Sequence, residues 1–232
     1  MSSRKKFFLV FVFIILDMFL LIGFLVIRDA TMLNDLKKEI NELTKLDITK
    51  DRYNTEIKSK GNYALVEKAI KEYLDDYAVS LQDVLFVIQD PQLTKILSYD
   101  NYSKDGPEFK ESLNYLKLTK KEFNEKMDDL LANLEEENIV NYANDKISDP
   151  YYAGLYKELM LSNNMKDDFN ETKDLLYKTK IRVNNVFDTS TEVLNFLVAN
   201  KNSWKLENGE IKFLTKDLYN KYNSMIAKIK TD

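Results

Sequence analysis

One uninterrupted apolar run near the N-terminus constrains this chain more than any other feature. Residues 7–27 read FFLVFVFIILDMFLLIGFLVI, and Asp17 is the only charged residue among them. As a helix with a rise of about 1.5 Å per residue, these 21 residues would extend about 31 Å, the thickness of a bilayer's hydrocarbon core. We therefore expect a transmembrane anchor.

The alternative to an anchor is a cleaved signal peptide. Signal peptides usually have an apolar region of about 7–15 residues, followed by small residues at the cleavage site. Here the run is longer, and Arg28 stands where a small residue would be needed. We therefore expect the segment to remain part of the mature protein.

The charges that flank the run predict its direction. Three basic residues at positions 4–6 precede it with no acid beside them, whereas Arg28 on the far side is followed at once by Asp29. Lys and Arg near a span favour the cytoplasmic side. We expect a single-pass cell-membrane protein in which residues 1–6 form a cytoplasmic tail and the main domain is extracytoplasmic.

Asp17 lies near the middle of the expected anchor, where a charge is costly. An acid there costs about 3 kcal/mol, but each Leu, Ile, Phe or Val returns roughly 0.3 to 0.6 kcal/mol, so the segment still inserts. Asp17 is either tolerated, as a protonated or locally hydrated acid, or it pairs with another membrane helix. That helix would belong to a second copy or to a membrane-protein partner, so Asp17 is a candidate partner-binding residue.

The composition favours helices for the rest of the chain. Only 5 Gly and 3 Pro occur in 232 residues, while 44% of the residues are hydrophobic and 31% are charged. Sandwiches, barrels and phosphate-binding loops need more Gly for tight turns. We therefore expect an all-α fold, in which a stalk helix and linker (28–61) lead to an elongated helical bundle (62–232).

Several chemistries are excluded by residue type. The chain has no Cys and no His, which rules out disulfides, thiol catalysis, zinc sites built on these residues and histidine general bases. Its net charge of -4 argues against nucleic acid as a partner. Paired acids such as Asp75-Asp76 point about 100° apart on a helix and read as solvated faces. We expect no catalytic residues, metal or cofactor, and no enzyme activity.

Apolar residues recur with 3-4 spacing along the predicted helices, the pattern of helices that pack on other helices. In two places an Asp-Pro pair, at Asp90 and at Asp149, predicts a helix start with the Asp as N-cap. The predicted seams are Leu33, Leu36, Ile40 and Leu43; Ile70, Leu74, Tyr77, Leu81, Val84 and Ile88; Phe109, Leu113, Leu116, Lys120, Phe123, Met127, Leu130 and Leu134; and Phe169, Thr172, Leu176, Thr179, Val183, Val186, Ser190, Val193 and Leu197.

Details of these helices give further expectations. Four further apolar residues widen the apolar face of the helix that begins near residue 63, which predicts a largely buried helix: Val79, Leu85, Phe86 and Val87. Lys120 is either a polar layer or a side chain that reaches water along the seam. The last seam is half hydroxyl-bearing and β-branched, so it should pack against the bulkier seam that begins at Phe109. Residues 98–107, SYDNYSKDGP, read as a loop.

The C-terminal part departs from the helical pattern. Residues 204–213, WKLENGEIKF, alternate apolar and polar residues about Asn208-Gly209, which predicts a β-hairpin with a type I′ turn. A final helix follows, with Thr215 as its cap. The hairpin should pack against the bundle, because two strands alone are marginally stable.

Tyr151, Tyr152 and Tyr156 form an aromatic group after the second Asp-Pro pair. Packing at the edge of the core is one interpretation, because Tyr buries its ring and leaves its hydroxyl wet. The other is a surface that binds a partner or ligand, so the three tyrosines are candidate partner-binding residues.

Together these features predict an interaction or scaffold protein that is accessory to a membrane-associated assembly. The alternative is a helical domain that senses or captures a ligand, since bundles often bind small molecules between helices.

Replacing the acid of the anchor tests whether it binds a partner. If Asp17 pairs with another membrane helix, Asp17→Leu should reduce recovery of that partner in a pull-down from native membranes, because the polar contact inside the bilayer is lost. Equal recovery with the wild-type and Asp17→Leu proteins would mean that the acid is merely tolerated.

Overall fold

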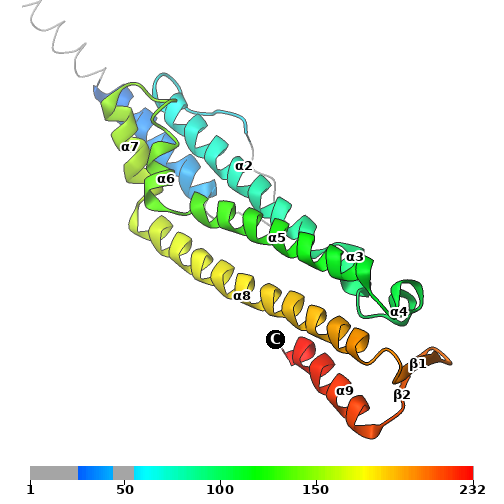
Figure 1. The fold of residues 1–232 in the computed structure, drawn as a ribbon. Coiled ribbons are helices and arrows are strands. Elements are labelled where there is room, and N and C mark those ends of the chain that lie inside the picture. The colour runs from blue at the N-terminus through cyan, green and yellow to red at the C-terminus, as the bar shows by residue number, and fades with distance from the viewer. Residues whose placement is uncertain (1–25, 44–54, 232) are drawn as a thin grey trace, which may run out of the picture. The chain divides into compact units, whose positions relative to one another are not determined.

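The computed structural model describes residues 26–43 and 55–231, which are mostly helical (Figure 1). The expected helical body with one small hairpin is confirmed. Residues 26–43 are helical. The elements that follow are α2 (Tyr63–Ile88), α3 (Pro91–Lys95), α4 (Tyr99–Asp105), α5 (Lys110–Asn133), α6 (Glu136–Asn141), α7 (Pro150–Met160), α8 (Asn163–Ala199), β1 (Trp204–Glu207), β2 (Glu210–Phe213) and α9 (Lys216–Thr231).

The described residues form two compact units. Unit 1 contains the residues up to Asp75 together with Ile139–Met165, and unit 2 contains Asp76–Asn138 and the residues from Lys166 onward. The first half of α2 thus belongs to unit 1 and its second half to unit 2. The predicted boundary between stalk and bundle, at residues 61 and 62, falls within unit 1 and stays a prediction.

Within residues 26–43 and 55–231, no helix has the length and apolar character needed to cross a membrane. The predicted anchor, residues 7–27, lies outside the described residues except for Val26 and Ile27. Asp17 and the predicted tail, residues 1–6, also lie outside them. The anchor and its orientation therefore stay predictions.

Both Asp-Pro helix starts are confirmed. The Asp90 carboxylate accepts a hydrogen bond from the backbone N–H of Gln92 at 2.8 Å, and Asp149 accepts one from Tyr151 at 2.9 Å. In each case the Pro occupies the first turn of the helix. Backbone N–H groups in the first turn have no acceptor within the helix, so the N–H that Pro lacks costs no helical hydrogen bond.

The hairpin forms in the predicted register. Trp204 pairs with Phe213 and Leu206 with Ile211, so these four side chains share one face. Asn208 and Gly209 have φ of 52° and 80°, the left-handed values that a type I′ turn requires. The hydroxyl of Thr215 then accepts a hydrogen bond from the N–H of Leu218 at 3.3 Å, as expected for the cap of α9.

The prediction of a loop over residues 98–107 is wrong for most of its length, because α4 forms there. Ser98 caps this helix by accepting a hydrogen bond from the N–H of Asn101 at 3.3 Å. Tyr102 is buried, and its ring contacts Phe109 at 5.5 Å between centroids. The segment is mostly polar, but it contains Tyr102, whose burial favours the helix.

The prediction that α2 is buried over a widened face is right for Val87 and wrong for Val79 and Phe86. Val87 is buried, whereas Val79 is 52% exposed and Phe86 is 81% exposed. The two exposed residues are seven apart, so they lie on the same face of α2, away from its buried seam. The apolar character of a residue alone therefore does not predict whether it lies on the buried face of α2.

The core of unit 2 pairs α5 with α8, as the two seams predicted. Phe123 of α5 contacts Phe187 of α8 at 5.9 Å between ring centroids. Beside this contact, the side-chain amides of Asn124 and Asn184 donate hydrogen bonds to each other at 2.9 Å. Lys120 reaches the surface and pairs with Asp188 of α8 at 2.5 Å. The polar groups between these helices are thus paired.

Unit 1 contains a buried ion cluster centred on Lys71. Its ammonium donates to Glu67 at 2.6 Å, to Glu39 at 3.0 Å and to the backbone carbonyl of Glu56 at 2.6 Å. All three of its donors are therefore used. Lys71 and Glu67 are 2% and 0% exposed, so the cluster is removed from water. It joins α2 to helical residues 26–43 and to the segment that precedes α2.

Hydrogen bonding controls the charge state of this cluster. Burial by itself raises the pKa of Glu67, but hydrogen bonds from Lys71 and from the N–H groups of Lys58 and Ser59 outweigh it, so the pKa lies below its usual value. Burial also raises the pKa of Glu39, but hydrogen bonds from Lys58 and Lys71 outweigh this effect, so the pKa of Glu39 is lowered too. Both acids are therefore carboxylates at neutral pH.

Removing the central cation should destabilise the protein strongly. Lys71→Met removes the ammonium that Glu39 and Glu67 share and leaves Glu67 buried with backbone N–H donors but no cation; breaking a buried ion pair in this way typically costs about 3–5 kcal/mol in the free energy of unfolding. Urea unfolding at pH 7 measures the loss. Lys68→Met, on the exposed face of the same helix, is the matched control and should change stability by less than about 0.5 kcal/mol. Equal stabilities of the two variants would contradict the role of the cluster.

The same cluster predicts acid sensitivity. Because the folded pKa values of Glu39 and Glu67 are lowered, their contribution is present above the unfolded pKa of about 4.3 and is lost as pH falls through the folded values. Comparing the urea curves of the wild-type and Lys71→Met proteins from pH 7 to pH 3 should show the difference between them shrinking below about pH 4.

Candidate functional site

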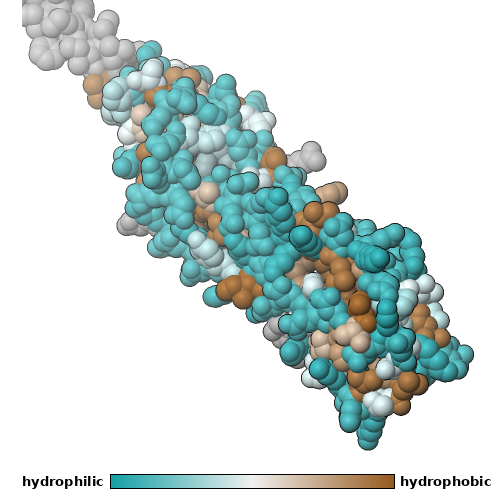
Figure 2. Space-filling model, in the orientation of Figure 1, coloured by the Kyte–Doolittle hydropathy of each residue, from teal (hydrophilic) through white to brown (hydrophobic). Residues whose placement is uncertain are grey.

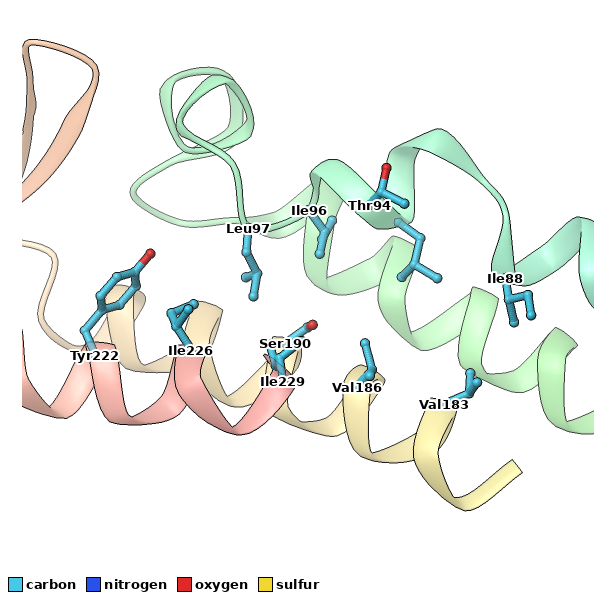
Figure 3. A pocket seen from close by; sticks show the side chains of 11 residues that line it. Ile88, Thr94, Ile96, Leu97, Val183, Val186, Ser190, Tyr222, Ile226 and Ile229 are labelled. Carbon is cyan, nitrogen blue, oxygen red and sulfur yellow. The ribbon is translucent and has the colours of Figure 1, made fainter. Parts of the chain in front are cut away.

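Unit 2 contains an apolar groove of about 460 Å³ (Figure 3). Figure 2 shows apolar residues gathered in the part of unit 2 where α3, α8 and α9 lie. The groove is lined by the end of α2, by α3 and the two residues after it, by α8 and by α9. The lining residues are Ile88, Leu93, Thr94, Ile96, Leu97, Val183, Val186, Ser190, Tyr222, Ile226 and Ile229.

The hairpin positions α9 as one wall of the groove. The indole N–H of Trp204 donates to the carbonyl oxygen of Leu197 at 2.8 Å, which holds β1 against the end of α8. Phe213 of β2 then contacts both Phe196 of α8 and Tyr222 of α9, at 6.2 and 5.2 Å between ring centroids. The chain therefore reverses direction at the hairpin, and α9 returns beside α8.

Two helical seams face the same space. Val183, Val186 and Ser190 are spaced by three and four residues on α8, and the α9 residues of the groove are spaced by four and three. In Figure 3, side chains from α9 and from the α3 region point into the space in front of α8. The small Val and Ser side chains on α8 leave room that larger residues would have filled.

The groove offers apolar contact and a few hydroxyl groups, and no charged side chain lines it. Thr94, Ser190 and Tyr222 carry the hydroxyls, and the other lining residues are Ile, Leu or Val. Ligand sites are typically clefts of about 300–1,000 Å³ with mainly apolar walls. This groove is therefore suited to bind uncharged, apolar groups.

Tyr222 links the groove to α4. Its hydroxyl lies 3.0 Å from the hydroxyl of Tyr102, and both side chains are buried. Burial raises the pKa of Tyr102, and the neighbouring Tyr222 raises it further; burial likewise raises the pKa of Tyr222. Both phenols stay neutral at physiological pH, so their shared hydrogen bond holds α9 to α4.

The three predicted tyrosines belong to unit 1, and only two of them reach its surface. Tyr151 is 58% exposed, and Tyr152 is partly exposed and contacts both Tyr151 and Tyr63, at 5.0 and 5.2 Å between perpendicular rings. Tyr156 is completely buried. A buried ring has no surface to offer a partner, whereas Tyr151 and Tyr152 remain candidates. Asp17 lies outside the described residues.

Sequence reasoning did not find the groove. It placed Val183, Val186 and Ser190 correctly on the seam of α8, but it expected the whole seam to be covered. The signal was present in the small size of these residues and in the matching spacing on α9. Neither the size of these residues nor their spacing shows how far apart α8 and α9 lie.

The described part of the chain contains no cluster of metal-ligating side chains. Among residues 26–43 and 55–231, no three acidic side chains converge to form a metal site. The groove has one ionisable group, the neutral phenol of Tyr222.

Comparison with known proteins adds no relative. No protein-family model matches the chain. No curated protein and no solved structure matches it either. A functional proposal therefore depends on the physical features of the chain itself.

The tyrosine pair gives a test of how α9 is held. Tyr222→Phe leaves the Tyr102 hydroxyl buried without a partner and should cost about 1–3 kcal/mol in the free energy of unfolding. The double variant Tyr102→Phe/Tyr222→Phe removes both polar groups and should recover most of that loss. Urea unfolding measures both. Tyr219→Phe, at an exposed position of α9, is the control and should be nearly neutral. A double variant less stable than the single one would contradict the assignment.

Proposed function

We propose that this protein is a membrane-anchored, extracytoplasmic interaction protein, accessory to a membrane-associated assembly. Residues 7–27 anchor it, and the groove of unit 2 receives an amphipathic helix of a partner protein. The observation that carries the proposal is the groove itself, a concave apolar site in a chain without Cys or His.

The walls of the groove favour a helix as its occupant. Both α8 and α9 present seam residues at three- and four-residue spacing, the arrangement that receives a third helix in a bundle. From Val183 to Ser190 the α8 wall extends about 10 Å at 1.5 Å per residue, enough for two turns of a bound helix. The partner would insert two or three aliphatic side chains.

A small apolar ligand is the second candidate. The volume of about 460 Å³ lies within the range of ligand pockets, and the hydroxyls of Thr94 and Ser190 could orient one polar group. Such a ligand would make the protein a sensor or a capturing domain. The same experiment separates the two candidates.

Site-specific photo-crosslinking in native membranes tests the proposal. A photoreactive residue at Leu97, which lines the groove, should form an adduct with a partner peptide that has apolar residues at three- and four-residue spacing. The same group at Ile181, a 62% exposed residue of α8 outside the groove, is the control and should form no such adduct. Mass spectrometry identifies the crosslinked peptide.

A charge placed in the groove sharpens this test. Val186→Lys should abolish the adduct at Leu97, because an unpaired ammonium is costly to bury against apolar side chains. Asn185→Lys, at the neighbouring exposed position, should leave the adduct unchanged. An adduct that survives Val186→Lys would refute groove binding, and a small-molecule adduct would favour the ligand candidate.

A further inference from the structure

Three segments of unit 1 meet at one end. Helical residues from Val26 onward, the start of α2 and the start of α7 lie together there (Figure 1). A Cβ placed on Gly61, just before α2, would be 3.2 Å from the terminal methyl group of Met32. Tyr63 at the start of α2 contacts Tyr152 at the start of α7, at 5.2 Å between rings. Residues 29–32 are therefore level with both helix starts.

The helix rise gives the distance of this end from the expected anchor. Asp29 and Met32 follow the last residue of the apolar run, Ile27, by two and five residues, or by about 3 and 8 Å along a helix. The headgroup region of each leaflet is about 5–8 Å thick, half the difference between the whole bilayer and its hydrocarbon core. The start of α2, level with Met32, would thus lie in the headgroup layer.

We infer that this end of unit 1 is a membrane-docking surface, in which Tyr151 and Tyr152 enter the phospholipid headgroup layer and Arg28 and Lys60 contact lipid phosphates. The inference rests on the proposed anchor. It adds that the folded body itself binds the lipid surface, so unit 1 is held against the bilayer instead of hanging from a flexible tether.

The side chains at this end have the chemistry of an interfacial surface. Tyr is enriched where membranes meet water, because its ring is apolar and its hydroxyl is polar. Tyr151 is 58% exposed and Ile27 is 68% exposed, on the same end as the exposed cations Arg28 and Lys60. These residues gain apolar contact and phosphate partners together when they enter the headgroup layer.

The helix starts and the acids are consistent with this orientation. α2 and α7 both begin here, so the partial positive charge of each N-terminus faces the lipid phosphates. Asp149 is occupied as the cap of α7. Burial raises the pKa of Tyr63, and the neighbouring Tyr151 and Asp29 raise it further, which places this second acid beside a tyrosine hydroxyl.

Single-cysteine labelling of the full chain tests the surface, because the protein has no Cys of its own. Tyr151→Cys and Lys60→Cys, each carrying a fluorophore, are reconstituted in vesicles of phosphatidylethanolamine and phosphatidylglycerol. Lipids with a nitroxide on the headgroup should quench both labels several-fold more than a label at Tyr177→Cys. Iodide in the water should quench them several-fold less. Tyr177 is a 45% exposed tyrosine of unit 2 and serves as the matched control.

A fourth label separates the failure of this inference from that of the anchor. Leu20→Cys lies within the expected span, so lipids with a nitroxide on the acyl chain should quench it. If that label is quenched while those at residues 60 and 151 are as open to iodide as the control, the anchor stands and membrane docking is refuted. If Leu20→Cys is not quenched, both ideas fail. Labels at 60 and 151 shielded from iodide and from nitroxide lipid alike would indicate contact between protein copies, which also overturns lipid docking.

Discussion

The structure of unit 2 depends on the packing of one long helix, α8, which contributes residues both to the core and to the groove. The bulky Phe187 fills the core against Phe123 of α5. Val183, Val186 and Ser190 lie on the adjoining seam of α8 and are smaller than Phe187, and the space in front of them stays open as the groove. Core and binding site are therefore made from adjoining faces of one helix, and side-chain volume distinguishes them.

Unit 1 achieves its packing by a different interaction. Lys71 is buried with Glu67 and Glu39, and the Glu67 carboxylate also accepts hydrogen bonds from the backbone N–H groups of the segment that precedes α2. An ion cluster of this kind adds little net stability compared with apolar packing, but it penalises every arrangement that leaves one member unpaired. In a chain without disulfides, it specifies how three segments meet.

Local signals in the sequence were sufficient for the elements that local interactions determine. The caps at Asp90 and Asp149 and the turn at Asn208-Gly209 involve neighbours in the chain, and all three form as predicted. The helix α4 was missed because the burial of Tyr102 depends on Phe109 and on Tyr222 of α9, which is distant in sequence. The groove was missed for the same reason, since its width depends on the separation of α8 and α9.

The ion cluster shows a similar limit. Glu67 and Lys71 are four residues apart on α2, a spacing that predicts an ordinary surface pair. Their burial requires Glu39 and the segment before α2 to cover them, which no local pattern indicates. The spacing of Glu67 and Lys71 thus predicts that they form an ion pair, but it does not predict that the pair is buried.

Shape distinguishes the groove from the other apolar surfaces of unit 2. Phe86 and Ile181 are more exposed than any apolar residue of the groove, yet each lies on the outward face of a single helix. A lone exposed apolar residue gives a partner contact on one side only and is common on protein surfaces. The groove surrounds an inserted side chain with α3, α8 and α9 at once. Because apolar association scales with the area removed from water, the concave site gains more from each inserted group than Phe86 can offer.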